Sequence, residues 1–164
     1  MEFQAKTAQA NTIKSGCIVV ALFEDNALSA SAKLLDQACN NYISKLVERG
    51  DANGKAGKKL LLTGLHNVAA ERILLIGMGK QGETTAKQFC DAITAVIATL
   101  KDSPAKNAYY FLNEVKVVAK DDAWKIRQQV QISHNALYTI DQFKSEKTPA
   151  IKLSKIFLAT DDAA

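Results

Sequence analysis

The chain has 164 residues, of which 48% are hydrophobic and 23% are charged, and its formal net charge at pH 7 is +4. This composition excludes an intrinsically disordered chain, which combines low hydrophobicity with a high net charge. No apolar run approaches the roughly 20 residues that a membrane-spanning helix needs, so we expect no membrane partner. The 21 basic and 17 acidic residues form no block of five or six like charges. At this length a single soluble domain is the default expectation.

The three cysteines, Cys17, Cys39 and Cys90, are widely spaced, lie within apolar patterns and form no C-x-x-C motif. We therefore expect reduced, buried thiols rather than a zinc site or a disulfide framework. The N-terminus has no basic segment followed by an apolar stretch, so no secretory signal is predicted. Both observations favour a cytoplasmic location.

Two strand-like segments open the chain. Residues 3–7 alternate apolar and polar side chains, which predicts a short edge strand. The β-branched apolar run at 17–23 is too short for a typical helix and predicts a strand buried on both faces. As a hairpin-like pair, these two segments are expected to make the sheet mixed.

A helix and a loop follow. Apolar residues at helical spacing across 28–46 predict one helix, with Ser29 or Asn26 as its N-cap and Gly50 as its end. The glycine-rich polar stretch 50–59 predicts a mobile surface loop. Its likeness to an ATP-binding P-loop is superficial. One residue too few separates Gly50 from Gly54, and Ala56 stands where a magnesium-binding Ser or Thr is needed.

The middle of the chain predicts two strands, at 60–62 and 73–76, and then a helix that includes 89–100. The helix start carries the capping-box pattern Thr85-Ala86-Lys87-Gln88. The last third predicts a strand at 109–112, a helix that begins at Asp121 or Asp122, and a strand at 156–159. This alternation predicts an α/β fold with helices on both faces of a mixed, mostly parallel sheet.

The segment Gly77-Met78-Gly79-Lys80-Gln81-Gly82 fits the G-x-G-x-x-G pattern of dinucleotide-binding turns. In such sites the glycines let backbone N–H groups approach a pyrophosphate at a helix N-terminus. A ribose-binding acid is expected about 20 residues further on, whereas the next strand ends near Glu114, about 32 residues beyond Gly82. The segment is therefore predicted to be a tight strand-to-helix turn that only glycine can make.

No catalytic or metal-binding constellation is evident in the sequence. The two histidines, His66 and His134, have no partners at the spacing of a zinc site or a Ser-His-Asp triad. Three lysines of the predicted loop, Lys55, Lys58 and Lys59, are the candidate contacts to nucleic-acid phosphates, which would give salt-sensitive binding without sequence preference.

Eight short segments, taken in order along the chain, share a pattern with one protein family. They are residues 1–3, 17–20, 35–37, 42–44, 49–51, 54–57, 71–80 and 124–128. The strongest is Glu71-Arg72-Ile73-Leu74-Leu75-Ile76-Gly77-Met78-Gly79-Lys80. Together they resemble, over nearly the whole chain, the N-terminal domain of bacterial leucyl aminopeptidases, which are also called cytosol aminopeptidases or aminopeptidase A.

The resemblance implies a macro-domain-like three-layer α/β sandwich for residues 1–159, with 160–164 beginning a linker to a C-terminal catalytic domain. It implies that the full-length protein releases N-terminal amino acids from peptides with two divalent metals, Mn²⁺ or Zn²⁺, held by a lysine and several acids of that absent domain. The family's metal-binding segment begins Asn-Thr-Asp-Ala-Glu-Gly-Arg, whereas the only Asn-Thr here, Asn11-Thr12, is followed by Ile13. No metal ligand carries over, so this chain alone is expected to be no enzyme and to hold no cofactor.

The resemblance also implies a homo-hexamer, in which this domain supports assembly and the catalytic domain. Two alternatives remain open. One is a DNA-binding module that uses Lys55, Lys58 and Lys59, because some bacterial relatives bind DNA. The other, by fold analogy alone, is a binder of ADP-ribose or another nucleotide.

Overall fold

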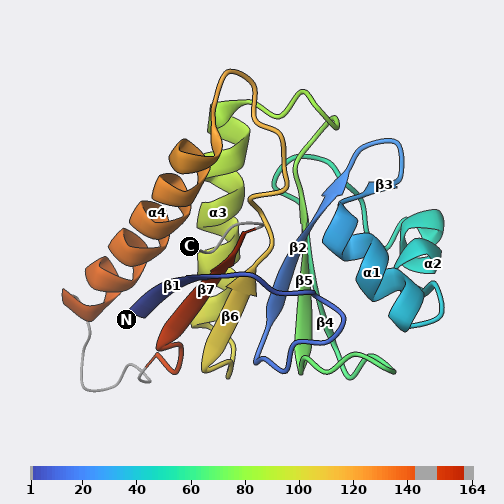
Figure 1. Ribbon diagram of the computed structural model, residues 1–164, viewed down its shortest axis with the longest axis horizontal. Coiled ribbons are helices and arrows are strands. Elements are labelled where there is room, and N and C mark those ends of the chain that lie inside the picture. The colour runs from blue at the N-terminus through green and yellow to red at the C-terminus, as the bar shows by residue number, and fades with distance from the viewer. Residues whose placement is uncertain (1, 143–150, 161–164) are drawn as a thin grey trace.

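One mixed sheet organises the protein, whose computed structural model describes residues 2–142 and 151–160, without the side chains of 139–142. The strands are β1 (Glu2–Lys6), β2 (Ile18–Phe23), β3 (Ala27–Leu28), β4 (Lys59–Thr63), β5 (Arg72–Gly77), β6 (Asn107–Tyr110) and β7 (Lys155–Ala159). Their order across the sheet is β1-β7-β6-β2-β5-β4, and β3 pairs with β2 (Figure 1).

The sheet is mixed, as predicted, but the predicted opening hairpin is wrong. β1 pairs in parallel with β7, at the other end of the chain. The antiparallel strands are β4, beside β5, and the short β3, beside β2. The connection from Thr7 to Cys17 is long enough to bring the chain back to the start of the sheet, so that β2 runs in the same direction as β1.

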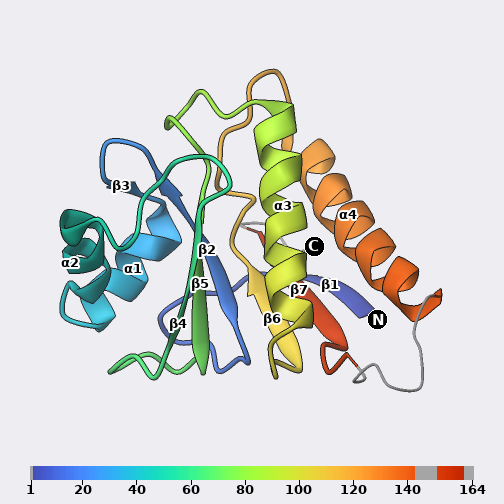
Figure 2. The same ribbon diagram turned by 180° about the vertical axis from the view of Figure 1, so that it is seen from behind.

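Four helices cover the sheet, namely α1 (Ala30–Ala38), α2 (Tyr42–Arg49), α3 (Ala86–Lys101) and α4 (Asp122–Gln142). Helices α3 and α4 lie on one face, and α1 and α2 lie on the other (Figures 1 and 2). Alternate residues of β2 therefore enter different cores. Val19 and Ala21 pack with α3, whereas Ile18 and Val20 pack with α1 and α2. This arrangement confirms the predicted three-layer sandwich.

The helix predicted across 28–46 is two helices. Asn40 and Asn41 adopt left-handed backbone conformations, with φ of 59° and 63°, and asparagine tolerates this region better than most residues. The break is bridged by Asp36 of α1, whose carboxylate accepts hydrogen bonds from the backbone N–H and the hydroxyl of Ser44 in α2. Helical spacing continues through the break, which explains why the sequence pattern did not reveal it.

The predicted helix ends are confirmed where they depend on local chemistry. Ser29 is the N-cap of α1, and Gly50 ends α2 with a φ of 84°. Thr85 and Gln88 form a complete capping box at the start of α3. At the start of α4, the Asp121 carboxylate accepts the backbone N–H of Trp124 at 2.8 Å, so Asp121 is the capping residue rather than Asp122.

All three cysteines are free thiols. Cys17 and Cys39 are buried, as predicted, whereas Cys90 is only half-buried. Burial raises the pKa of the Cys17 thiol from 9.0 to about 12, despite the opposing influence of Arg72. Since the thiolate is the reactive form, Cys17 is chemically inert at neutral pH.

Candidate functional site

A groove of about 510 Å³ lies beyond the carboxyl ends of β6 and β7. This is the edge of a parallel sheet at which ligands of α/β proteins usually bind. Its apolar wall comes from Leu34 of α1, Phe111 after β6 and Ile126 of α4. The polar residues along it are Gln9, Ser31, Asn113, Glu114, Asp122 and Thr160.

Glu114, an exposed residue of the loop after β6, lies at the N-terminal end of α1. Its carboxylate accepts hydrogen bonds from the backbone N–H and from the hydroxyl of Ser31, both at 2.9 Å. A helix N-terminus carries a partial positive charge and exposed N–H donors, so it favours an anion. Here the chain supplies that anion itself, from a residue 83 positions away.

The loop that carries Glu114 is held by a buried lysine. Lys125 of α4 donates from Nζ to the carbonyl oxygens of Asn113 at 2.7 Å and Val115 at 3.0 Å. The same ammonium group lies 2.9 Å from the carboxylate of Asp122. Gln129, one turn further along α4, donates to the side-chain oxygen of Asn113 at 3.3 Å. The loop after β6 is therefore fixed to α4 by charge-assisted bonds.

Sequence reasoning missed this network, although the sequence carries a signal for it. Lys125, Gln129 and Ser133 follow one another at intervals of four, which places them on one stripe of α4, and all three are buried. A polar stripe on a helix usually faces solvent, so the pattern alone predicts that these three side chains are exposed. The partners of Lys125 and Gln129 lie in the loop after β6, whose position the sequence pattern does not predict, and Ser133 bonds to Tyr110 of β6.

The chemistry of the groove disfavours a nucleotide ligand. Two carboxylates, Glu114 and Asp122, lie along it and would repel a diphosphate, and the helix N-terminus that would attract one is already occupied. These features argue against the ADP-ribose hypothesis.

The glycine segment 77–82 is a turn, as predicted. The first three backbone N–H groups of the segment are already bonded within the protein, from Gly77 to the carbonyl of Lys58, from Met78 to that of Leu22 and from Gly79 to that of Gly54. Gly79 and Gly82 have positive φ angles of 81° and 80°, which glycine adopts without strain.

The stretch 50–59 lies mostly on the surface, as predicted, but Ala52 and Gly54 are buried and the stretch is bonded to the end of β5. Gly57, with a φ of 82°, donates its N–H to the carbonyl of Gly77, and Gly77 donates back to Lys58. Gly57 and Lys58 thus both lie opposite Gly77. This arrangement is a β-bulge of the type that has a left-handed glycine at its first position. Gly54 is buried, and a Cβ there would overlap the backbone of Phe23.

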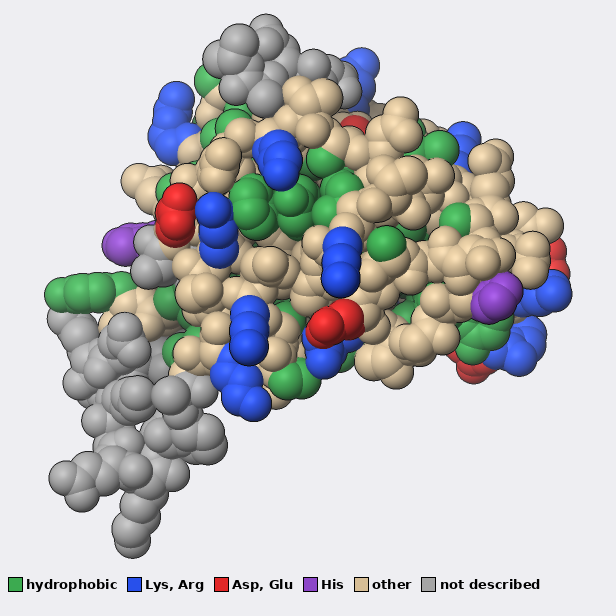
Figure 3. Space-filling view, turned by 60° about the horizontal axis from the view of Figure 1, so that its bottom comes forward, with side chains coloured by type: hydrophobic (Ala, Val, Ile, Leu, Met, Phe, Trp, Pro, Cys, Tyr) green, Lys and Arg blue, Asp and Glu red, His purple; other side chains and the backbone are tan. Residues whose placement is uncertain are grey.

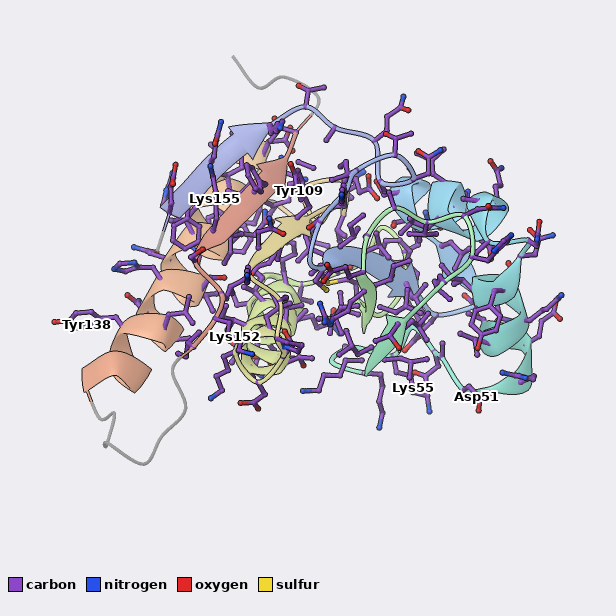
Figure 4. All side chains as sticks on the ribbon, turned by 90° about the horizontal axis from the view of Figure 1, so that it is seen from below. Asp51, Lys55, Tyr109, Tyr138, Lys152 and Lys155 are labelled. Carbon is purple, nitrogen blue, oxygen red and sulfur yellow. The ribbon has the colours of Figure 1, made fainter. Side chains whose placement is uncertain are left out.

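The three candidate DNA-contacting lysines, Lys55, Lys58 and Lys59, are exposed at the start of β4 and in the connection before it. Figure 4 shows Lys55 beside the α2 side of the molecule, well away from Lys152 and Lys155. On the face drawn in Figure 3, Lys and Arg side chains stand as separate groups around an apolar patch, without a continuous basic stripe. The structure therefore offers a small lysine cluster rather than an extended basic surface.

The histidines do not contribute to a catalytic centre. His66 is exposed in a turn, and His134 is exposed on α4, where its ring lies against Tyr138 and Phe3. Within residues 2–142 and 151–160, no three His, Cys, Asp or Glu side chains are grouped so that they could hold a metal ion. None of the helices in this part of the chain is long and apolar enough to cross a membrane.

Sequence comparisons identify close relatives of this chain. The family model described as the cytosol aminopeptidase family, N-terminal domain, matches residues 19–147. A probable cytosol aminopeptidase of Tolumonas auensis is 44% identical over 147 residues, which are 90% of this chain and 29% of that relative. The probable cytosol aminopeptidase of Aliivibrio fischeri is 43% identical over 147 residues, again 90% of this chain and 29% of that relative. The chain thus spans less than a third of the length of these curated relatives.

Solved structures confirm the fold. A mutant of tomato leucine aminopeptidase has a TM-score of 0.70 at 16% sequence identity. The match covers 100% of this chain and 33% of the tomato chain. A Trypanosoma brucei macrodomain has a TM-score of 0.71 at 12% identity, covering 96% of this chain and 61% of its own. Identities this low show the macro-like fold alone. The family model and the curated relatives show more: the chain belongs to the cytosol aminopeptidase family, as its N-terminal domain.

Proposed function

We propose that this chain is the non-catalytic N-terminal domain of a two-metal leucyl aminopeptidase, a cytoplasmic hydrolase that releases N-terminal amino acids from peptides. The observation that carries the proposal is the uneven coverage of the relatives. Their similarity extends over 90% of this chain but only 29% of the Tolumonas auensis protein, so most of that protein has no counterpart here.

The described side chains of this chain do not fit a two-metal centre. Two metals in a hydrolase activate water and polarise the scissile carbonyl, and several protein side chains must hold them. The described side chains provide no group of three such ligands. We therefore place the Mn²⁺ or Zn²⁺ ions of the parent enzyme in its C-terminal catalytic domain.

In this proposal residues 1–159 support the catalytic domain and its assembly into a homo-hexamer. Residues 160–164 begin the linker to that domain, of which 161–164 lie outside the described residues. Thr160 lies on the groove beyond β6 and β7, so the linker would leave the domain beside Glu114 and Asp122.

The proposal predicts that the 164-residue chain does not hydrolyse a leucine amide substrate, with or without added Mn²⁺, because the residues that hold the metals belong to the C-terminal domain. A chain extended by the C-terminal portion should be active under the same conditions. Release of leucine is the measurement, and the extended chain is the control for substrate and metal. Chelator-sensitive turnover by the short chain would refute the proposal.

We propose DNA binding as a second function, supported by the exposure of Lys55, Lys58 and Lys59 and by the lack of an ion pair for any of them among the described residues. Changing all three to glutamate should abolish retention on duplex DNA at about 50 mM salt, because each phosphate contact releases counterions. Lys87→Glu, on the exposed side of α3, is the matched control. No retention of the unaltered chain, or equal retention of the triple variant, would contradict this function.

A further inference from the structure

β4 is an edge strand that leaves an apolar, self-complementary edge open. It ends the strand order and, among the strands that the structure describes, pairs with β5 alone. Its sequence is Lys-Leu-Leu-Leu-Thr, and Leu60, Leu61 and Leu62 are each only half-buried. The other edge strand, β1, has Phe3 as its single large apolar residue. Open, regular and apolar edges are templates for pairing with another strand.

The register of β4 defines which backbone groups point outward. Gly77 donates to the carbonyl of Lys58, so this pair bonds directly across the two strands. Bonded and non-bonded pairs alternate along an antiparallel ladder. Leu60 and Leu62 therefore bond to β5, and the N–H and C=O groups of Lys59, Leu61 and Thr63 point to the free edge.

We propose that this edge pairs with β4 of a second copy of the chain, in an antiparallel register centred on Leu61. In this register Leu61 faces Leu61 of the other copy, and Lys59 faces Thr63. All of these pairs use the outward backbone groups, so each forms hydrogen bonds in both directions. No like charges are brought together, because each lysine lies opposite a threonine.

The proposal goes beyond the supporting role argued above, and it does not depend on hydrolysis or on a catalytic domain. It assigns an interface to this chain alone. The half-buried leucines explain why a second copy fits better than an unrelated extended segment. The two-fold register pairs Leu60 with Leu62 on one face of the sheet and Leu61 with its own equivalent on the other, so apolar surface is covered on both faces.

Sedimentation of the 164-residue chain from about 10 μM to about 1 mM tests the proposal. We expect the average mass to rise from 17.8 kDa towards twice that value. Thr63→Lys should raise the dimer Kd by about 2- to 30-fold, because it sets two lysines opposite each other in both symmetric pairs. Thr63→Glu should lower the Kd by a similar factor, because glutamate would face Lys59.

The double variant Lys59→Glu with Thr63→Lys controls for damage to the fold. It restores opposite charges across the interface, so its Kd should return to that of Thr63→Glu, whereas a destabilised monomer would not recover. Amide exchange adds a second readout. Protection of Lys59, Leu61 and Thr63 should rise with protein concentration, while Leu60 and Leu62 are protected throughout. A chain that is monomeric over the whole range, or charge variants that shift the Kd in the same direction, would overturn the proposal.

Discussion

Gly77→Ala is expected to lower the free energy of unfolding by about 3 kcal/mol or more. A Cβ at this position would lie less than 3.0 Å from the Lys55 carbonyl oxygen and the Gly54 carbonyl carbon. Both are backbone atoms, so no side-chain rotation can make room. Hydrogen bonds in both directions also hold the bulge against the end of β5. The Gly57 N–H donates to the carbonyl of Gly77, and the Gly77 N–H donates to the carbonyl of Lys58. The alanine must therefore separate the bulge from β5.

Urea unfolding at neutral pH measures this loss. Gly82→Ala is the matched control, because Gly82 has a φ of 80° but open space around its Cα. That variant should lose only the strain of a left-handed alanine, about 1–2 kcal/mol. Gly77 itself has no positive φ, so a loss in Gly77→Ala no larger than that in Gly82→Ala would mean that the overlap with the bulge costs no more than the strain of one left-handed alanine.

Lys125→Met is expected to destabilise the protein by about 2–3 kcal/mol, since it leaves the carbonyls of Asn113 and Val115 without their donor. Methionine keeps the length and apolar character of the lysine stem, so the packing against the loop changes little. The side chain of Lys125 is only 8% exposed, which prevents water from replacing the ammonium group fully. The loss should therefore appear as lower stability and as faster amide exchange in the loop after β6.

Lys87→Met separates this effect from the general loss of a positive charge. Lys87 also forms an ion pair on a helix, with Asp91 at 2.7 Å, but its side chain is 85% exposed. An exposed pair of this kind contributes little to stability, so Lys87→Met should unfold at nearly the same urea concentration as the unaltered chain. If both variants unfold at the same urea concentration, Lys125 does not hold the loop in the way described here.

The features that the sequence predicted correctly are those set by neighbouring residues. The capping box at Thr85 and Gln88 spans four residues, and the run that becomes β2 is apolar because α/β packing buries both of its faces. The glycines at 77–82 also specify their turn locally. Short-range chemistry of this kind is readable without knowledge of the tertiary structure.

The features that were missed depend on partners far along the chain. Glu114 meets Ser31 across 83 residues, and the pattern of neither segment indicates the other. The stretch 50–59 reads as a surface loop by composition, yet Gly54 lies against the backbone of Phe23. The break at Asn40 and Asn41 interrupts the backbone without disturbing the apolar spacing. In each case a tertiary contact decides between conformations that the local sequence permits equally.

The parallel pairing of β1 with β7 sets the order in which the domain can be completed during synthesis. Glu2 lies opposite Lys155 and Lys6 opposite Ala159, so β1 can pair only after β7 has been synthesised. Until then both β1 and the neighbouring edge of β6 lack their partner. In the nascent chain β1 is therefore an unpaired strand, whereas β6 is paired with β2 and has one open edge, and both edges can pair wrongly before β7 is made.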